Sequence, residues 1–99
     1  MKYFELKASN QKSYYGKANV FERSDGWKIL KSYDTEVCGI DGNGIFHRYW
    51  NAYSATTMKH VNDFLRLYNI HEGGKSWWTQ QKIENFNWIA FYIGYKEEA

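Results

Sequence analysis

Residues 50–69 read WNAYSATTMKHVNDFLRLYN, and this stretch decides the fold because it carries the clearest helical pattern of the chain. At about 100° per residue, one face collects mostly apolar side chains: Thr57, Met58, Val61, Phe64, Leu65 and Tyr68. The opposite face collects charged ones: Lys59, Asp63 and Arg66. Ser54 is suited to cap the N-terminus by accepting from the amide of Thr57. The pattern predicts an amphipathic helix over residues 54–69 that covers one face of a sheet.

Strand patterns precede this helix. Alternating or β-rich segments lie at residues 1–8, 14–23, 27–40 and 45–50, and they are separated by turn-forming residues at 24–26 and 41–44. Residues 32–35, Ser-Tyr-Asp-Thr, interrupt the third segment, where we expect a bend or bulge. The chain is therefore predicted to be an α+β protein, with a bent antiparallel sheet of four to five strands and the main helix on one face.

The C-terminal third gives a weaker pattern. Ser76 could cap a short second helix over residues 77–85. Residues 88–95, WIAFYIGY, are apolar on both faces and rich in β-forming residues, which favours a buried last strand. The alternative is one longer helix through this region, because no proline interrupts it.

Length and composition set the class of protein. A chain of 99 residues predicts a single domain. Cys38 is the only cysteine, which excludes a disulfide framework and fits a reducing cytosol. The N-terminal residues MKYFELK do not resemble a signal peptide, and no run of about 18 apolar residues could span a membrane. We expect a cytoplasmic protein without a membrane partner.

Chemical motifs are absent from the sequence. His47, His60 and His71 have no metal-ligand spacing, and Cys38 lies in a strand pattern where a free cysteine behaves as a small apolar residue. No glycine-rich loop is followed by the lysine and hydroxyl residue of a phosphate site. We therefore predict no metal, no cofactor and no enzymatic activity.

Two sets of residues are candidates for binding. Tyr14, Tyr15, Lys17, Lys28 and Lys31 interleave aromatic and basic side chains on adjacent strands, a composition that suits single-stranded nucleic acid; the alternative is an ordinary solvated sheet face. Trp77 and Trp78 form the second set. Adjacent tryptophans on a short helix cannot both face one core, so one could anchor a protein partner, unless both are buried between that helix and the last strand.

A longer motif supports a family resemblance. It begins with residues 32–37, SYDTEV, and continues after Trp50 and Tyr53 with residues 54–65, SATTMKHVNDFL. This pattern resembles a family of small uncharacterised proteins carried by phages and plasmids of Gram-positive bacteria, with the signature SYxTxV followed by YSATTxxHINEFL. The resemblance covers about residues 13–69, whereas the aromatic segment from Trp77 departs from it. It implies an accessory protein of a mobile element in a bacterial cytosol.

The resulting functional expectation is a non-enzymatic binding protein that inhibits a host defence complex, such as a CRISPR nuclease, by protein–protein contact. One alternative is direct binding of single-stranded nucleic acid. Another is a homodimeric accessory protein that pairs through Trp77 and Trp78 or through an open sheet edge, and a monomer is also compatible with the sequence. Within the motif, His60 and Asn62 lie on the helix flanks and have neither a capping nor a core role, which makes them functional candidates.

Overall fold

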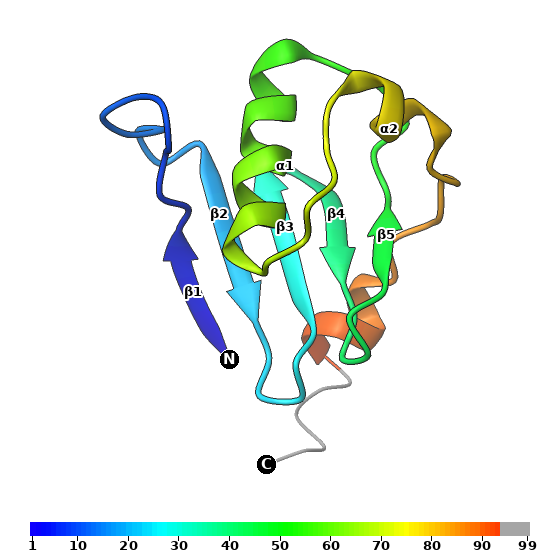
Figure 1. The fold of residues 1–99 in the computed structure, drawn as a ribbon. Coiled ribbons are helices and arrows are strands. Elements are labelled where there is room, and N and C mark those ends of the chain that lie inside the picture. Colours follow the sequence, from blue (N-terminus) through cyan, green and yellow to red (C-terminus); the bar gives the residue numbers. More distant parts are fainter. Residues whose placement is uncertain (94–99) are drawn as a thin grey trace.

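Five antiparallel strands form one sheet in the order of the sequence, β1-β2-β3-β4-β5 (Figure 1). The computed structural model describes residues 1–93. The strands are β1 (Lys2–Glu5), β2 (Ala18–Glu22), β3 (Lys28–Ser32), β4 (Thr35–Ile40) and β5 (Phe46–Arg48). With the helices described below, this arrangement confirms the predicted α+β fold.

The interruption at residues 32–35 is a tight hairpin rather than a bend within one strand. Ser32 pairs with Thr35, so Tyr33 and Asp34 alone connect β3 to β4. A register shift between Leu30 and Lys31 adds a bulge beside this turn. The backbone of Tyr33 is left-handed, with φ of 55°, which a chain reversal this short requires of at least one residue.

Helix α1 (Ala55–Leu67) packs on one face of the sheet. The side chain of Ser54 accepts a hydrogen bond from the amide of Thr57 at 3.0 Å, as the sequence predicts. The expected apolar face is buried in the main core, except that Tyr68 is only partly covered. The core between helix and sheet is formed by side chains such as Val61, Phe64, Val20 and Leu30.

Asp63 lies on the charged face of α1, as the pattern indicates, but unlike Lys59 and Arg66 it is buried. The loop between β1 and β2 folds against that side of α1. From this loop, the Tyr14 hydroxyl and the Ser9 amide both donate hydrogen bonds to Asp63, and Arg66 pairs with it from the next turn of the helix. A carboxylate can be buried here because it has three polar partners.

Helix α2 (Lys75–Gln80) begins two residues earlier and ends five residues earlier than the predicted range of 77–85. The backbone is extended at Gln81, and Ile83 makes a single parallel bridge to Arg48 on β5. Within residues 1–93, every helix is too short or too polar to cross a membrane.

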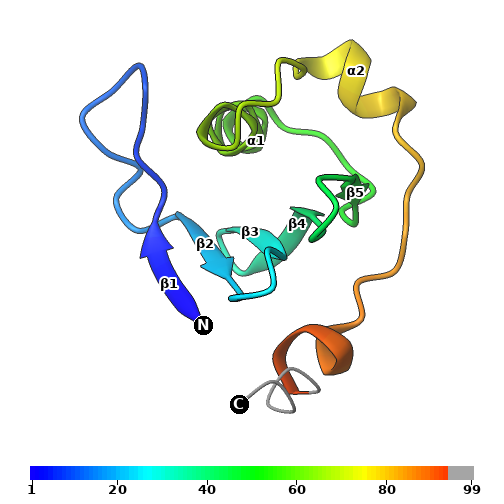
Figure 2. The ribbon, with the colours of Figure 1, turned by 60° about the horizontal axis from the view of Figure 1, so that its bottom comes forward.

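The predicted strand over residues 88–95 is wrong for the part that is described, and its residues 94 and 95 lie outside the described chain. Residues Ile89–Ile93 form a single wide helical turn, η1. Figure 2 shows η1 and α1 on opposite sides of the sheet. Phe91 faces the sheet and is buried, whereas Trp88 and Ile89 are exposed. The segment therefore covers a second face of the sheet instead of extending its edge.

Candidate functional site

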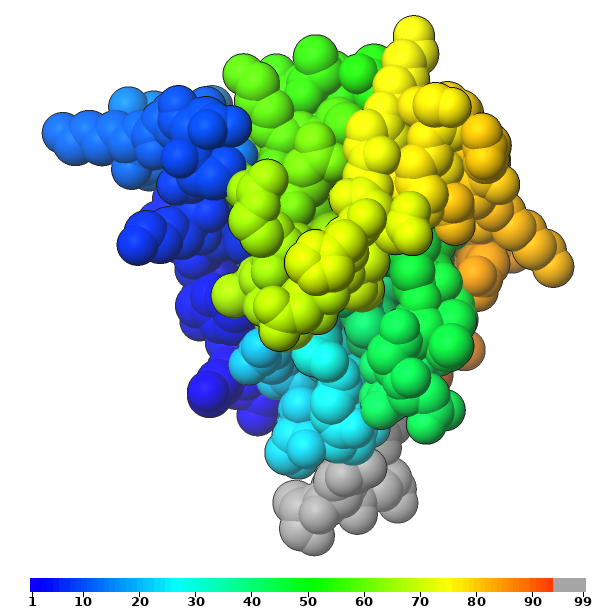
Figure 3. Space-filling model, viewed as in Figure 1, coloured from blue at the N-terminus to red at the C-terminus, as the bar shows by residue number. Residues whose placement is uncertain are grey.

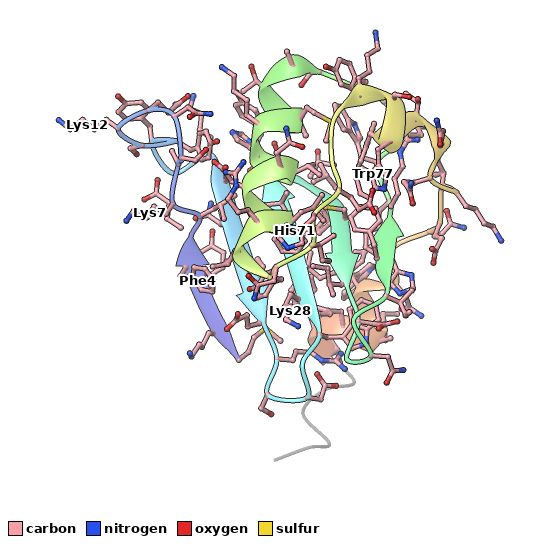
Figure 4. The ribbon with its side chains drawn as sticks, in the orientation of Figure 1. Phe4, Lys7, Lys12, Lys28, His71 and Trp77 are labelled. Carbon is pink, nitrogen blue, oxygen red and sulfur yellow. The ribbon has the colours of Figure 1, made fainter. Side chains whose placement is uncertain are left out.

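The five predicted basic and aromatic residues do not form one patch. The Tyr14 hydroxyl points inward to Asp63, and its ring is buried. Lys28 lies toward the opposite end of the sheet (Figure 4), with its ammonium 4.9 Å from the ring centre of Tyr68. Lys31 pairs across the strands with Asn19 and Glu36 and is partly buried. Of the set, Tyr15 and Lys17 remain exposed and adjacent.

Tyr33 joins these two residues, and the three are called the turn surface here. Tyr15 is 70% exposed and Tyr33 is 49% exposed. The Tyr33 amide donates to the carbonyl of Lys17 at 2.7 Å, and the Lys17 ammonium lies 5.5 Å from the Tyr33 ring centre. The loop that carries Tyr15 projects from the body of the protein (Figure 3). The turn surface therefore presents two exposed tyrosines from neighbouring turns, with the Lys17 ammonium over the ring of Tyr33.

Both tyrosines of the turn surface have left-handed backbones, with φ of 55° at each. A bulky residue in this conformation costs on the order of 1–3 kcal/mol and persists only where its surroundings fix it. At Tyr15 the amide donates to Ser13 Oγ at 2.7 Å, and the next amide, of Gly16, donates to Glu5 Oε2 at 2.6 Å. Glycine or asparagine would fit such positions with less strain, so tyrosine there suggests a role for its side chain.

His60 lies beneath the turn surface rather than on it. Its side chain is 1% exposed, and Nδ1 is 2.8 Å from the Ser32 hydroxyl. Its ring contacts Tyr14 at 4.4 Å and Tyr33 at 5.9 Å between centroids. Burial lowers the pKa of His60, so the imidazole is neutral at neutral pH. The residue positions Tyr33 from below and does not itself reach solvent.

Asn62 holds the start of α2. Its Oδ1 accepts from the Gly74 amide at 3.1 Å. A Cβ atom at Gly73 would lie 2.5 Å from the same oxygen, and Gly73 has φ of +130°, so this position requires glycine. Both flank positions of the motif thus have structural partners that are distant in sequence.

Replacing His60 with alanine is expected to lower the free energy of unfolding by about 2–4 kcal/mol, because it leaves a cavity and removes one of the two hydrogen bonds of the buried Ser32 hydroxyl. Asn62→Ala should lower it by only about 1 kcal/mol, through one lost hydrogen bond. Urea denaturation followed by circular dichroism measures both. A loss below about 0.5 kcal/mol for His60→Ala would contradict the structural assignment.

The two tryptophans differ in burial. Trp78 is 1% exposed, and its indole N–H donates to the carbonyl of Ala52 at 2.8 Å. Trp77 is partly buried against Phe46, with ring centroids 4.8 Å apart (Figure 4). Trp78 is therefore a core residue, and only Trp77 retains surface.

A pocket on the second face of the sheet was not predicted from the sequence. It has a volume of about 280 Å³ and lies between the sheet and the segment that leads into η1. Aromatic and charged side chains line it, among them Arg23, Trp27, His47, Tyr49, Glu84, Phe86 and Phe91. Behind it the sheet is tightly packed, since a Cβ atom at Gly39 would lie 2.6 Å from Ile29 Cδ1.

His47 lines this pocket and is nearly parallel to two neighbouring rings. Its ring centroid is 5.5 Å from that of Trp27, at 14° between the planes, and 6.4 Å from that of Tyr49, at 5°. The ring nitrogens face carboxylates, with Nε2 2.8 Å from Asp41 and Nδ1 3.0 Å from Glu84. Burial alone would lower the pKa of His47, but the hydrogen bonds and charges of the two carboxylates outweigh it and raise that pKa. His47 and Glu84 are 37 residues apart, so no local pattern could reveal the contact.

We expect His47 to stabilise the protein more at acidic than at alkaline pH. Because its pKa is raised on folding, its contribution is complete below the unfolded value of about 6.5 and is lost as pH rises through the folded value. The pKa of Asp41 is lowered, so its carboxylate stays ionised in mild acid. The difference in unfolding free energy between wild type and His47→Gln should be larger at about pH 5.5 than at about pH 9.

The depressed pKa of His60 works in the opposite direction, since its contribution is lost as pH falls below about 6.5 and through its folded value. Comparing His47→Gln with wild type at each pH cancels that effect. A difference that grew toward alkaline pH would contradict a protonated His47.

Comparison with known proteins shows the family to which most of the chain corresponds. A family model described as "Family of unknown function (DUF8033)" matches residues 1–80. The chain belongs to this family. The DUF8033 match is wider than the resemblance inferred from the motif, and it confirms that the family is uncharacterised. No curated protein and no solved structure matches the chain.

The DUF8033 region ends at the last residue of α2, so it includes the whole sheet, α1, α2 and the turn surface. Residues 81–93, which form the outer wall of the second-face pocket, lie beyond it.

Proposed function

We propose that this DUF8033 protein is a non-enzymatic binding protein of a phage or other mobile element, which inhibits a host defence complex such as a CRISPR nuclease by protein–protein contact. The observation that carries the binding role is the turn surface, with two exposed tyrosines in left-handed backbone conformations and Lys17 over the ring of Tyr33. Tyrosine is enriched among the residues that dominate the energy of protein interfaces.

Preorganisation supports this role. The conformations of Tyr15 and Tyr33 are fixed by backbone hydrogen bonds to Ser13 and to Lys17. Tyr33 also rests on the buried ring of His60. Turns whose backbone is already ordered lose less conformational entropy when a partner binds, which favours binding through this small surface.

The mobile-element setting rests on the motif in residues 32–65 and its resemblance to phage and plasmid proteins. That setting implies the cytoplasm of a bacterial host, where defence nucleases act. The step from the family to inhibition of a nuclease is an analogy, and the turn surface gives it a site to test.

A tagged pull-down from the host, read by mass spectrometry, tests the proposal. Tyr15→Asn and Tyr33→Asn remove the rings, while asparagine tolerates the left-handed backbone. We expect the wild-type protein to retain a host defence protein and to block its cleavage activity, and the double variant to lose both. Ile45→Asn, at an exposed position in the turn before β5, is the control and should behave as wild type. A partner retained equally by the double variant would contradict a role for the turn surface.

Direct binding of single-stranded nucleic acid is the second candidate, because the same three side chains suit it. Bases stacking on two tyrosines would contribute about 1–3 kcal/mol each, and Lys17 would contact a phosphate. A gel shift at low salt that weakens steeply with added salt and after Lys17→Ala is the expected result. No shift at low salt would remove this candidate.

A homodimer is the third candidate, and it is supported only by an unpaired strand edge. Trp78 is buried and cannot pair with a second copy, whereas β1 is the first strand of the sheet and pairs on one side only, with β2. Unpaired strand edges can associate. Light scattering that gives a dimer mass would support pairing, and a monomer mass would exclude it.

A further inference from the structure

Residues 86–92 contact the second face of the sheet in the manner of a bound peptide. Arg23 Nη1 donates to the carbonyls of Ala90 at 3.0 Å and Phe91 at 3.3 Å. Its guanidinium also lies 5.1 Å from the centre of the Phe91 ring. The segment is thus held through its main-chain carbonyls by a side chain of the sheet, a contact that would serve other sequences equally well.

Two adjacent aromatic side chains fix the position of this segment. Phe91 is 2% exposed, and its ring lies 5.8 Å from that of Trp27. Tyr92 stacks edge-on against Phe21 at 5.2 Å, and its hydroxyl is 3.5 Å from Glu36. The sheet therefore offers one site for an aromatic ring and a neighbouring site for a ring with a hydroxyl group.

The segment covers this face incompletely. The second-face pocket of about 280 Å³ remains between it and the sheet. Trp88, just before η1, and Ile89, its first residue, are each 55% exposed. The DUF8033 match ends at residue 80, so it includes the strands of this face but not the segment that covers them.

We propose that the second face of the sheet is an acceptor surface for a peptide segment of a partner protein, with two adjacent aromatic residues in one helical turn. Residues 86–92 of this chain occupy the surface in cis and compete with that partner. The Arg23 guanidinium can donate to main-chain carbonyls of such a turn, and the Glu36 carboxylate can accept from the hydroxyl of its second aromatic residue. This inference does not rest on the turn surface, which lies elsewhere on the fold.

The Glu84–His47 contact limits release of the cover. Glu84 precedes the segment in the chain, and its amide also donates to the Arg48 carbonyl at 2.8 Å. These two contacts tie the chain to β5 just before residues 86–92. Weakening the contact should therefore make the surface more available.

A labelled synthetic peptide with the sequence of residues 85–93, flanked by lysines for solubility, is the probe. The full-length release variant Phe91→Ala/Tyr92→Ala changes only the cover and leaves the acceptor residues in place. We expect it to bind the peptide at least about tenfold more tightly than wild type, because competition in cis lowers the apparent affinity of the wild-type chain. Fluorescence anisotropy measures the binding.

A matched control removes two exposed apolar side chains at the start of η1. Trp88→Ala/Ile89→Ala should bind the peptide as weakly as wild type. Adding Arg23→Ala to the release variant should abolish binding, and so should a peptide with alanine at both aromatic positions.

Circular dichroism establishes whether the release variant is folded. If the release variant is not folded, the Glu84→Gln variant replaces it in the binding assay. We expect Glu84→Gln to bind the peptide a few fold more tightly than wild type. A folded release variant that binds no more tightly than wild type would overturn the proposal, as would equal binding of the alanine peptide. The pull-down with the Tyr15 and Tyr33 variants depends on neither result, so failure of this inference and failure of the proposed function are separate outcomes.

Discussion

Replacing Arg48 with alanine is expected to lower the free energy of unfolding by about 3–5 kcal/mol, because it removes the hydrogen bonds of a charged donor to three carbonyls and the packing of a buried side chain. Arg48 is 5% exposed and donates to the carbonyls of Trp50 at 2.9 Å, Trp78 at 3.0 Å and Ala52 at 3.3 Å. Its guanidinium also stacks 4.5 Å from the Trp78 ring centre. One side chain on β5 thus joins the sheet to the chain on both sides of α1.

Arg48→Met separates the hydrogen bonds from the packing, since methionine keeps an apolar stem beside Trp78 but donates nothing. We expect Arg48→Met to lose most of the unfolding free energy that Arg48→Ala loses. Lys59→Ala, at an exposed position of α1, should stay within about 0.5 kcal/mol of wild type. Urea denaturation gives all three values, and a near-native Arg48→Met would show that the carbonyls do not need the guanidinium.

The main helix and the core-facing side of the sheet were predictable because they depend on short-range periodicity. Ser54 caps the helix, and Val61, Phe64 and Leu65 are buried as the pattern indicates. The burial of Asp63 was not predicted, for a definite reason. Its partners, Ser9 and Tyr14, are about 50 residues distant, and a helical projection contains no information on what another loop brings to a charged side chain.

The C-terminal segment was mispredicted because its pattern is ambiguous. Residues 88–93 are apolar on all sides, which a buried strand and a buried helix share at this length. In the fold, Phe91 faces the sheet and is buried, whereas Trp88 and Ile89 are exposed. Burial therefore explains only part of the apolar character of this segment. The strand patterns do not reveal a second covered face either. Apolar residues such as Phe21 and Ile29 fit an edge strand as well as a strand buried in a core.

The candidate site was partly predictable for the same reasons. Tyr15 and Lys17 are neighbours in sequence and were identified together. Tyr33 was not, because its place beside Lys17 depends on the register of β2 and β3 and on a two-residue turn. His60 was predicted to be a functional candidate on the helix flank without a core role, whereas the structure buries it beside Ser32 and Tyr33.

Replacing Trp78 with alanine is expected to lower the free energy of unfolding by about 3–5 kcal/mol, the second large effect in this chain. The side chain is 1% exposed, and it forms the surface on which Arg48 stacks. Its removal leaves a cavity and also takes away the shorter of two hydrogen bonds to the Ala52 carbonyl, the one from the indole at 2.8 Å. Unfolding in urea, followed by far-UV circular dichroism, measures the loss.

Trp77→Ala is the matched comparison, because it removes the same side chain one residue earlier. Trp77 is only partly buried and packs mainly on Phe46, so we expect a loss of about 1–2 kcal/mol. The ratio of the two losses tests how α2 is oriented on the sheet. If α2 were rotated to bury Trp77 instead, the order of the losses would reverse, and the Arg48 and Trp78 variants would no longer be coupled in a double-mutant cycle.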